Sequence, residues 1–392
     1  MEPKPDVVSH DGFFISIGII AWNEERAIPS LLQSVFQQTL FQELARRGLR
    51  CEVFCVANGC TDRTVEVATE LFREQERNPE QAALFSGKAI NLSQRGKINA
   101  WNEFVHSLSA REARYLILMD ADIVIHNPRT LWNLVQALES DPEARVSVDV
   151  PRKDLEFKPE KTFREQMSLR MSRLTRSASA QLCGQLYCIR SETARNIFLP
   201  RDLTACDDGF IKSLVCTDFL SHGVWPSRIQ LARDASHTFE AYTSLKSVFK
   251  NQKRQAIGQT IVHLLIDDYL KRMPAWERAR LAETLRRKEH DNPDWLKKLI
   301  HEHLRRKRFF WRLYPGLISH RFLKLKSLSW SGRIKALPAV LLGTALSLIA
   351  SFAAFRFLKS GSTNYWPRAE RSSLQSIDLS ASVGSMTRFK IH

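Results

Sequence analysis

Short apolar runs alternate with helical patterns through the first half of the chain, and each run ends in a cluster of polar residues. The first run, Phe13–Ala21, is continuous and Ile-rich, which is typical of a strand buried on both faces of a sheet. The same reasoning predicts strands at residues 51–57, 89–92, 115–119 and 146–150, and helices at 28–49, about 62–77, 97–108 and from 127 onward. This alternation predicts an α/β fold with a Rossmann-like, mostly parallel sheet flanked by helices.

The second half of the chain is helical and strongly basic. The protein contains 58 Lys and Arg but 42 Asp and Glu, which gives a net charge of +16. Much of the excess lies between Lys297 and Lys335, where Glu302 is the only acidic residue. Aromatic residues lie among these cations, a mixture that is typical of helices in the headgroup layer of a membrane. A basic helix packed against the preceding domain is the alternative interpretation.

An uncharged apolar run, Ala336–Phe355, follows this basic segment. It is long enough to cross a bilayer, and the cations before it would keep the α/β domain in the cytoplasm. A buried or interfacial helix is the alternative. The first residues show no signal-peptide pattern, which also favours a cytoplasmic N-terminal domain at the inner (plasma) membrane of the cell.

Four regions are therefore predicted. They are an α/β domain over residues 1–235, a basic, membrane-proximal helical region over 236–335, a transmembrane helix over 336–358 and a polar, disordered tail over 359–392. The seven cysteines form no zinc-binding or C-x-x-C pattern, so we expect buried thiols in a reducing compartment. No helix-turn-helix, zinc or RNA-binding pattern accompanies the basic charge, and we therefore expect no nucleic-acid partner.

Two acidic pairs carry the strongest chemical signal. Asp120 and Asp122 follow the predicted strand at 115–119, and ligands in parallel sheets bind beyond the carboxyl ends of the strands. Their oxygens can hold Mg²⁺ or Mn²⁺, and such a cation neutralises a diphosphate. Asp207 and Asp208 stand before a predicted helix, where they either cap it or supply a general base.

Three further polar clusters lie at strand ends. They are Trp22-Asn23-Glu24-Glu25, the segment from Asn58 to Thr64, and Gly96-Lys97 with Ala100 and Asn102. A Lys at the start of a helix can reach phosphate, and polar loops can bind a base or a ribose. Because ordinary loops and helix caps have the same composition, the order of the clusters along the chain is what makes them informative.

In this order the five clusters resemble the family 2 glycosyltransferases, whose catalytic domain has the GT-A fold. The similarity extends over about residues 13–260. It implies an inverting reaction with Asp208 as the catalytic base beside Asp207, and a divalent cation on Asp122 and Asp120. The donor-binding residues that the resemblance implies are Asn23, Glu25, Asn58, Asp62, Lys97, Asp120, Gln252 and Arg254.

Two departures from the family pattern limit what the resemblance implies. Asn58 replaces an Asp that usually contacts the nucleotide base, so the base is not fixed as uracil. The stretch from Asn251 to Gln255 looks like the family's Gln-Gln-x-Arg-Trp box without its Trp, which cradles the acceptor sugar in polymer-making members. The absence of this Trp predicts a single transfer rather than chain elongation.

The resemblance predicts a metal-dependent glycosyltransferase that moves one sugar from a nucleotide sugar. The apolar run and the basic, aromatic segment before it indicate an acceptor at the membrane, a lipid or cell-envelope glycan precursor. The basic helix predicted at Lys161–Ala180 would line the acceptor side, and His237 either completes the metal shell or is structural. An inactive protein of the same fold that binds a nucleotide sugar or glycan is the alternative. A nucleotidyltransferase would share the metal chemistry, but it usually has a Gly-rich loop where this chain has Asn23-Glu24-Glu25.

Overall fold

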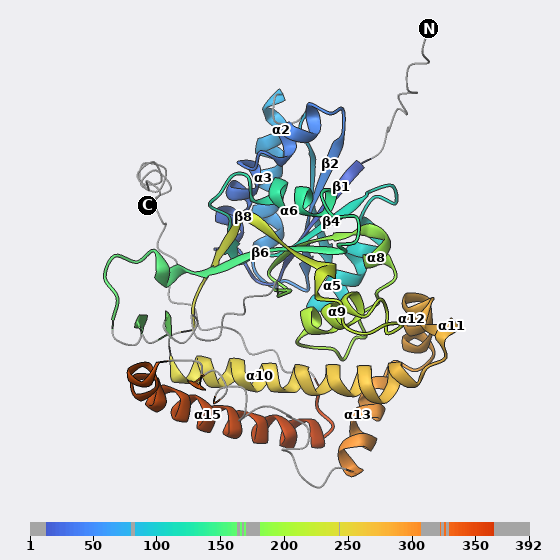
Figure 1. The fold of residues 1–392 in the computed structure, drawn as a ribbon. Coiled ribbons are helices and arrows are strands. Elements are labelled where there is room, and N and C mark those ends of the chain that lie inside the picture. The colour runs from blue at the N-terminus through green and yellow to red at the C-terminus, as the bar shows by residue number, and fades with distance from the viewer. Residues whose placement is uncertain are drawn as a thin grey trace.

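The computed structural model describes residues 13–363 apart from 80–82, 163–164, 167, 170–180, 243, 307–321, 323–324 and 327–328. These residues build an eight-stranded sheet in the order β3-β2-β1-β4-β7-β6-β8-β5 (Figure 1). The strands are β1 (Phe13–Ala21), β2 (Arg50–Asn58), β3 (Ser86–Leu92), β4 (Tyr115–Asp120), β5 (Ile123–Val124), β6 (Val146–Lys153), β7 (Leu186–Arg190) and β8 (Ile229–Phe239).

Most of the described strands run in one direction. The pairs β1–β2, β2–β3, β1–β4 and β6–β8 are parallel, whereas β7 is antiparallel to both β4 and β6, and the short β5 is antiparallel to β8. The predicted α/β class with a mostly parallel sheet flanked by helices is therefore confirmed. The sequence reasoning did not predict β5, β7 or β8.

Alternate residues of each central strand pack against opposite layers of helices, as the two-residue period of a strand requires. Tyr115, Ile117 and Met119 of β4 belong to one core, while Leu116 and Leu118 belong to the other. The first core is covered by α1 (Ile28–Phe36), α2 (Leu40–Ala45), α3 (Thr64–Arg77) and α6 (Thr130–Glu139). The second is covered by α5 (Lys97–Glu103), the π-helical turn η1 (Phe104–Leu108), α8 (Ser191–Arg195) and α9 (Asp207–Cys216).

The prediction of one helix over 28–49 is wrong, because the helical segment is interrupted between Phe36, the end of α1, and Leu40, the start of α2. The Thr39 backbone N–H donates to the Pro128 carbonyl at 2.8 Å, and the Gln38 side chain donates to the Ser34 and Asn127 carbonyls. These contacts with the segment before α6 replace the helical bonds that would have continued α1.

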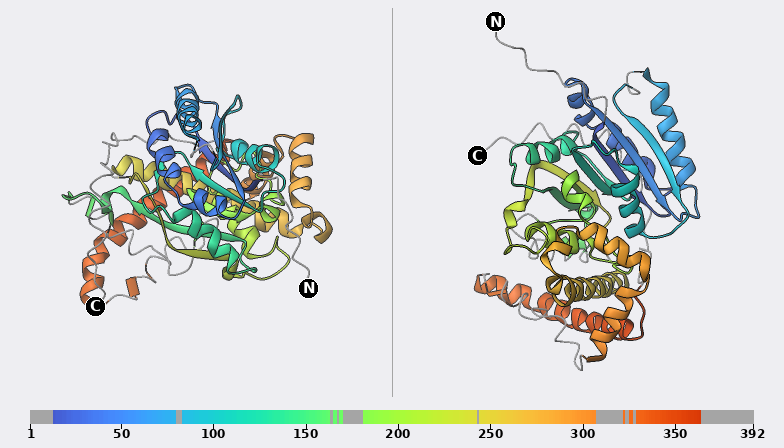
Figure 2. Two further views of the ribbon diagram at one scale, coloured as in Figure 1. Left: turned by 90° about the horizontal axis from the view of Figure 1, so that it is seen from above. Right: turned by 90° about the vertical axis from the view of Figure 1, so that its right-hand side faces the viewer.

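A helical region follows β8 and lies beneath the α/β domain. Residue 235, the predicted end of the first domain, lies inside β8. The helices that follow are α10 (Leu245–His263), η4 (Leu264–Tyr269), η5 (Leu270–Arg272), α11 (Ala275–Arg278), α12 (Leu281–Asp291), α13 (Trp295–Arg306) and α15 (Trp330–Lys359). In Figure 1 and in the right-hand view of Figure 2, α10 lies between the α/β domain and α15.

The predicted apolar run at 336–358 lies within α15. Within the described part of the chain, the segment Gly332–Lys359 is the one helix long and apolar enough to cross a membrane by length and composition. The aromatic basic segment at 307–321, residues 364–392 of the predicted tail and most of the predicted helix at 161–180 lie outside the described residues.

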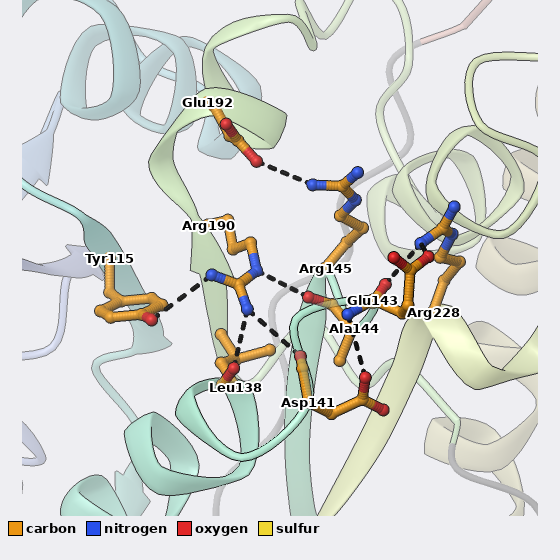
Figure 3. A network of polar contacts seen from close by, with 9 residues as sticks. All are labelled: Tyr115, Leu138, Asp141, Glu143, Ala144, Arg145, Arg190, Glu192 and Arg228. Atoms are coloured by element: carbon orange, nitrogen blue, oxygen red, sulfur yellow. Dashed lines mark hydrogen bonds and ion pairs between the residues drawn. The ribbon is translucent and has the colours of Figure 1, made fainter.

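At the amino end of β4, the Arg190 guanidinium joins the strand to the end of α6 (Figure 3). Its Nε donates to the Ala144 carbonyl at 2.7 Å, and its Nη2 donates to the Leu138 and Asp141 carbonyls at 2.7 and 3.2 Å. The last carbonyls of a helix have no partner within the helix, and here one cation satisfies the Leu138 carbonyl of α6 together with two carbonyls of the turn that follows it. This contact fixes the end of the sheet that lies away from Asp120.

Candidate active site

The carboxyl end of β4 brings together residues from four separate segments. Asp120 ends the strand, Lys97 begins α5, and Asp207 and Asp208 begin α9. The Lys97 Nζ atom lies 2.7 Å from Asp120 Oδ1 and 3.8 Å from Asp207 Oδ2. It also donates to the Gly184 carbonyl at 3.2 Å. The structure thus gathers three predicted acidic residues around the ammonium group of a fourth predicted residue, Lys97.

The electrostatics of this cluster are dominated by burial and by negative charge. Burial raises the pKa of Asp120 to about 6, and Asp122 and Asp207 add to the shift while Lys97 opposes it. Burial and the neighbouring Asp207 carboxylate also raise the pKa of Asp208. Burial disfavours the charge on Lys97, but the surrounding carboxylates outweigh that effect and raise the pKa of its ammonium. The site therefore contains more negative charge than Lys97 alone can offset.

This donor set fits a hard divalent cation. Carboxylate oxygens are the ligands that Mg²⁺ and Mn²⁺ prefer, and Mg²⁺ commonly takes only one or two of them together with substrate phosphates and water. In the part of the chain that the structure describes, no three His, Cys, Asp or Glu side chains form a group that could hold a metal by themselves. Asp120 and Asp122 would thus be two protein ligands in a shell that a bound diphosphate completes.

A second group of predicted residues lies at the carboxyl ends of β1 and β2. Asn23 Oδ1 accepts from the Thr61 backbone N–H at 2.7 Å, and Glu25 Oε2 accepts from the Arg63 backbone N–H at 3.2 Å. Asp62 Oδ2 accepts from the Glu25 backbone N–H at 3.2 Å. These hydrogen bonds join the loop after β1 to the loop after β2, and together the two loops form one half-buried rim beside the sheet.

Asn58 has a different place from the one expected of a base-binding residue. Its side chain is 2% exposed, its Nδ2 donates to the Ala21 carbonyl at 2.6 Å, and its Oδ1 accepts from the Gly96 backbone N–H at 3.1 Å. Because both polar ends of the amide are engaged in a buried setting, Asn58 ties β1 to the loop before Lys97. The structure gives it a role in positioning that loop.

The two residues predicted on α10 point in different directions. Gln252 Oε1 accepts from Ser347 Oγ of α15 at 3.2 Å, so this side chain faces away from the acidic cluster. Arg254 lies close enough to Cys206 to counter part of the rise in pKa that burial imposes on that thiol. The structure therefore brings Arg254, but not Gln252, near the start of α9.

The junction between α10 and α9 is close and strained. A Cβ atom on Gly258 would lie 2.7 Å from the Ala205 backbone, so only glycine allows this approach. Cys206, the residue before Asp207, has a φ of 59°, a left-handed conformation that is uncommon outside glycine. Packing against α10 thus holds the backbone that presents Asp207 and Asp208.

Sequence reasoning missed a buried pair beside the cluster. His237 on β8 and Asp149 on β6 are fully buried, and His237 Nδ1 lies 2.8 Å from Asp149 Oδ2. The other ring nitrogen, Nε2, lies 3.4 Å from Gln185 Oε1. With both nitrogens facing protein groups, the geometry supports the structural interpretation of His237. Asp149 lies within a predicted strand, but only the pairing of β6 with β8 brings it to His237.

Part of the chain is similar to a known protein family. Residues 16–195 match the family model described as Glycosyl transferase family 2. No curated protein sequence matches the chain.

Three solved structures are similar to the chain at low sequence identity and with TM-scores under 0.5. A mannosyltransferase from Pyrobaculum calidifontis in complex with GDP-Man and Mn²⁺ is 17% identical. The match covers 91% of this chain and 88% of the mannosyltransferase, with a TM-score of 0.49. The S. aureus protein TarS is 13% identical, and the match covers 89% of this chain and 92% of TarS residues 1–349 with a TM-score of 0.41. Glucosyl-3-phosphoglycerate synthase from Mycobacterium tuberculosis, in complex with Mn²⁺ and UDP-Glc, is 14% identical. The match covers 64% of this chain and 79% of the synthase, with a TM-score of 0.42.

Proposed function

Because residues 16–195 match the model of Glycosyl transferase family 2, we propose that this protein moves a sugar from a nucleoside diphosphate sugar to an acceptor hydroxyl with inversion. One observation carries the proposal. Asp120 and Asp207 converge on Lys97 at the carboxyl edge of the sheet, with Asp208 as the next residue. Ligands of open α/β sheets bind at this edge.

The proposed reaction needs one base and one stabilised leaving group. The acceptor oxygen attacks the anomeric carbon of the sugar while the bond from that carbon to the diphosphate oxygen breaks. The proton of the acceptor passes to the Asp208 carboxylate, and the nucleoside diphosphate leaves with the bonding electron pair. The raised pKa of Asp208 makes this carboxylate a better proton acceptor than an exposed Asp.

The remaining residues are assigned to binding and orientation. Asp120 and Asp122 would hold a divalent cation, which when bound neutralises the charge of the diphosphate. Lys97 stands at the N-terminus of α5, where its ammonium and the helix dipole both favour phosphate. Asn23, Glu25 and Asp62 form the rim on the nucleotide side.

The acceptor is proposed to be a lipid or lipid-linked glycan at the cytoplasmic face of the membrane, to which a single sugar is added. The long basic sequence after Asp294 and the apolar helix α15 support a membrane setting. Gln255, where the processive pattern has Trp, supports a single transfer, since this residue accepts a contact from Cys206 Sγ at 3.1 Å and offers no ring to an acceptor sugar.

The test is nucleoside diphosphate release from a panel of nucleotide sugars with Mn²⁺ or Mg²⁺ and a lipid extract as acceptor source. We expect one donor to be consumed by the wild-type protein, and Asp208→Asn to lower the rate by about 10³-fold with donor affinity preserved. Asp141→Asn is the matched control, because Asp141 is an Asp at the opposite end of the sheet.

Two outcomes would contradict the proposal. Wild-type turnover in Asp208→Asn would remove the assigned base. Donor binding by the wild-type protein without release of nucleoside diphosphate, with any donor of the panel, would instead indicate an inactive binding protein of the same fold.

A further inference from the structure

Helix α15 has an exposed and a buried stripe of side chains, and both contain many apolar residues. Each stripe repeats every three or four residues, which places its members on one face of the helix. Among the described side chains between 334 and 352, the exposed stripe consists of apolar residues, and exposed Arg356 and Lys359 follow it; its members are Ile334, Leu337, Pro338, Leu341, Leu342, Ala345, Ile349 and Phe352. The buried stripe consists of Val340, Thr344, Ser347, Ala350, Ser351, Ala354, Phe355 and Leu358.

This arrangement differs from a helix on a water-soluble domain, where the face turned away from the core is polar. Here hydroxyl groups face inward, since Thr344 Oγ1 donates to the Val340 carbonyl and Ser347 Oγ donates to Gln252 of α10. On the outer face, Leu341 is 52% exposed and Ile349 is 57% exposed. A contiguous apolar face of this kind marks a surface that is covered in the working state of the protein.

The inner face of α15 is fixed to the rest of the molecule. Phe355 and Leu358 belong to the same core as the helices that cover the sheet. Just past the helix, Thr363 Oγ1 donates to Asp202 Oδ1 at 2.7 Å, and Thr204 Oγ1 donates to the Thr363 carbonyl at 2.7 Å. The C-terminal end of α15 is thus docked on the α/β domain.

This docking conflicts with a helix that crosses a bilayer. Figures 1 and 2 show α15 lying across the underside of α10 rather than projecting from the domain. Lys253 of α10 lies over the Phe357 ring at 4.8 Å, and Arg254 is the next residue. If α15 crossed a membrane in this arrangement, these charged residues would enter the hydrocarbon layer with it, at a cost of several kcal/mol.

The charge around the stripe identifies what covers it. Residues 303–369 contain no Asp or Glu, and α15 itself carries Arg333, Lys335, Arg356 and Lys359. A second copy of the chain on this face would bring like charges together, whereas anionic lipid headgroups complement them. The cations flank the apolar stripe, as in helices that lie at the membrane interface.

We propose that α15 lies in the plane of an anionic membrane surface, with its exposed stripe at the acyl boundary and with α10 and the α/β domain above it. This placement takes the role that the sequence assigned to a transmembrane helix at 336–358. Because α10 contacts Cys206 on its other side, Asp208 would stand on the order of 20 Å above the lipid, two helix layers away. That the catalytic base faces an acceptor in this membrane rests on the proposed function, whereas the contact of α15 with the membrane does not.

The first test measures binding to vesicles by co-sedimentation. The wild-type protein should bind vesicles of phosphatidylcholine with phosphatidylglycerol better than pure phosphatidylcholine, and added salt should weaken that binding. The double variant Leu341→Glu/Ile349→Glu should bind at least about tenfold more weakly. Val224→Glu is the matched control, because Val224 is 69% exposed on the α/β domain and lies outside the stripe. Equal binding by the double variant and the wild type would overturn the proposal.

The second test distinguishes a helix in the plane from one that crosses. Trp330 and Ser360 stand at the two ends of α15 and are exposed, so Trp330→Cys and Ser360→Cys can be labelled with a membrane-impermeant maleimide. On intact vesicles both positions should react equally, above the background of the wild-type cysteines. Protection of one end until detergent is added would show a crossing helix and refute the proposal.

The two proposals can fail independently. In the absence of lipid, the double variant should hydrolyse a nucleotide sugar at the wild-type rate, and Asp208→Asn should bind vesicles like the wild type. If the double variant loses dimer mass in solution and keeps its vesicle binding, the stripe is a contact between copies and the membrane assignment is wrong.

Discussion

The two ends of strand β4 lie in opposite chemical environments, although the strand is only six residues long. At its amino end, the Arg190 guanidinium is surrounded by backbone carbonyls and the Tyr115 hydroxyl (Figure 3). At its carboxyl end, Asp120 and its acidic neighbours share Lys97. One end therefore has its polar groups matched by the fold, and the other end carries an excess of negative charge.

This difference indicates what each end is for. A buried charge without enough compensation lowers stability, so a fold keeps it where a ligand supplies the missing partner. The amino end needs no such partner, because Arg190 and the end of α6 satisfy one another. We therefore expect changes at the amino end to alter stability alone, and changes at the carboxyl end to alter the response to ligands.

The largest effect on stability is expected from Arg190→Met. The change leaves the Ala144, Leu138 and Asp141 carbonyls without their donor, so we expect the free energy of unfolding to fall by about 3 kcal/mol. Urea denaturation followed by circular dichroism measures this loss. The turnover rate of the folded protein should stay at the wild-type value, because Arg190 lies far from the acidic cluster along β4.

Arg145→Met is the control for this prediction. Arg145 pairs with Glu192 at 2.7 Å in the same region, but the Glu192 side chain is 71% exposed. Solvent screens such a pair, so its loss should cost less than about 1 kcal/mol. An equal loss of stability in both variants would show that charge removal in general, rather than the unpaired carbonyls, destabilises this end.

A somewhat smaller effect is expected from divalent cations at the carboxyl end. A hundredfold excess of Mn²⁺ over its dissociation constant should raise the free energy of unfolding by about 2.7 kcal/mol, because the cation binds the folded acidic site alone. Asp122→Asn should lose most of this increase. Arg190→Met should keep all of it despite its lower starting stability, and a cation effect that is equal in Asp122→Asn and wild type would contradict the site.

The parts of the fold that the sequence predicted depend on local patterns. The strands ending at Ala21 and Asp120 are recognisable because an apolar run stops at a polar cluster, and Lys97 follows a glycine at a helix start. These features need only neighbouring residues, and the topology then collects them at one edge of the sheet. Strand β7 was missed because its five residues are identified mainly by antiparallel pairing with β4 and β6.

The roles of single side chains were harder to predict, because they depend on distant partners. Asn58 meets the Ala21 carbonyl 37 positions away, and Asp149 meets His237 88 positions away. Gln252 is turned toward α15 by a contact with Ser347, 95 positions later. A motif gives the residue type at a site, but packing decides whether that residue faces a ligand or another part of the chain.

The smallest predicted effect gives the two ends opposite responses to pH. Near the amino end, burial lowers the pKa of His106 from 6.5 to about 4, and Arg286 and Arg195 add to the shift. Between these values the unfolded chain binds a proton that the folded protein does not, so stability falls as the pH drops from about 6.5 to about 4. Asp120 acts in the other direction, since its pKa is raised from 3.8 to about 6 and its contribution to stability is lost as the pH rises through that window.

Replacing His106 should therefore separate two slopes that partly cancel in the wild type. His106→Gln keeps a donor for the Ile197 carbonyl, which lies 2.9 Å from His106 Nε2, but it removes the titrating ring. We expect the variant to resist acid better than the wild type by on the order of 2 kcal/mol between pH 6.5 and 4, after allowance for partial exposure of the ring. Urea unfolding at a series of pH values measures the difference, with the exposed His222→Gln as control. If the stabilities of His106→Gln and His222→Gln depend on pH in the same way, the amino end does not respond to pH through His106. The two ends would then differ only in that the carboxyl end binds a ligand.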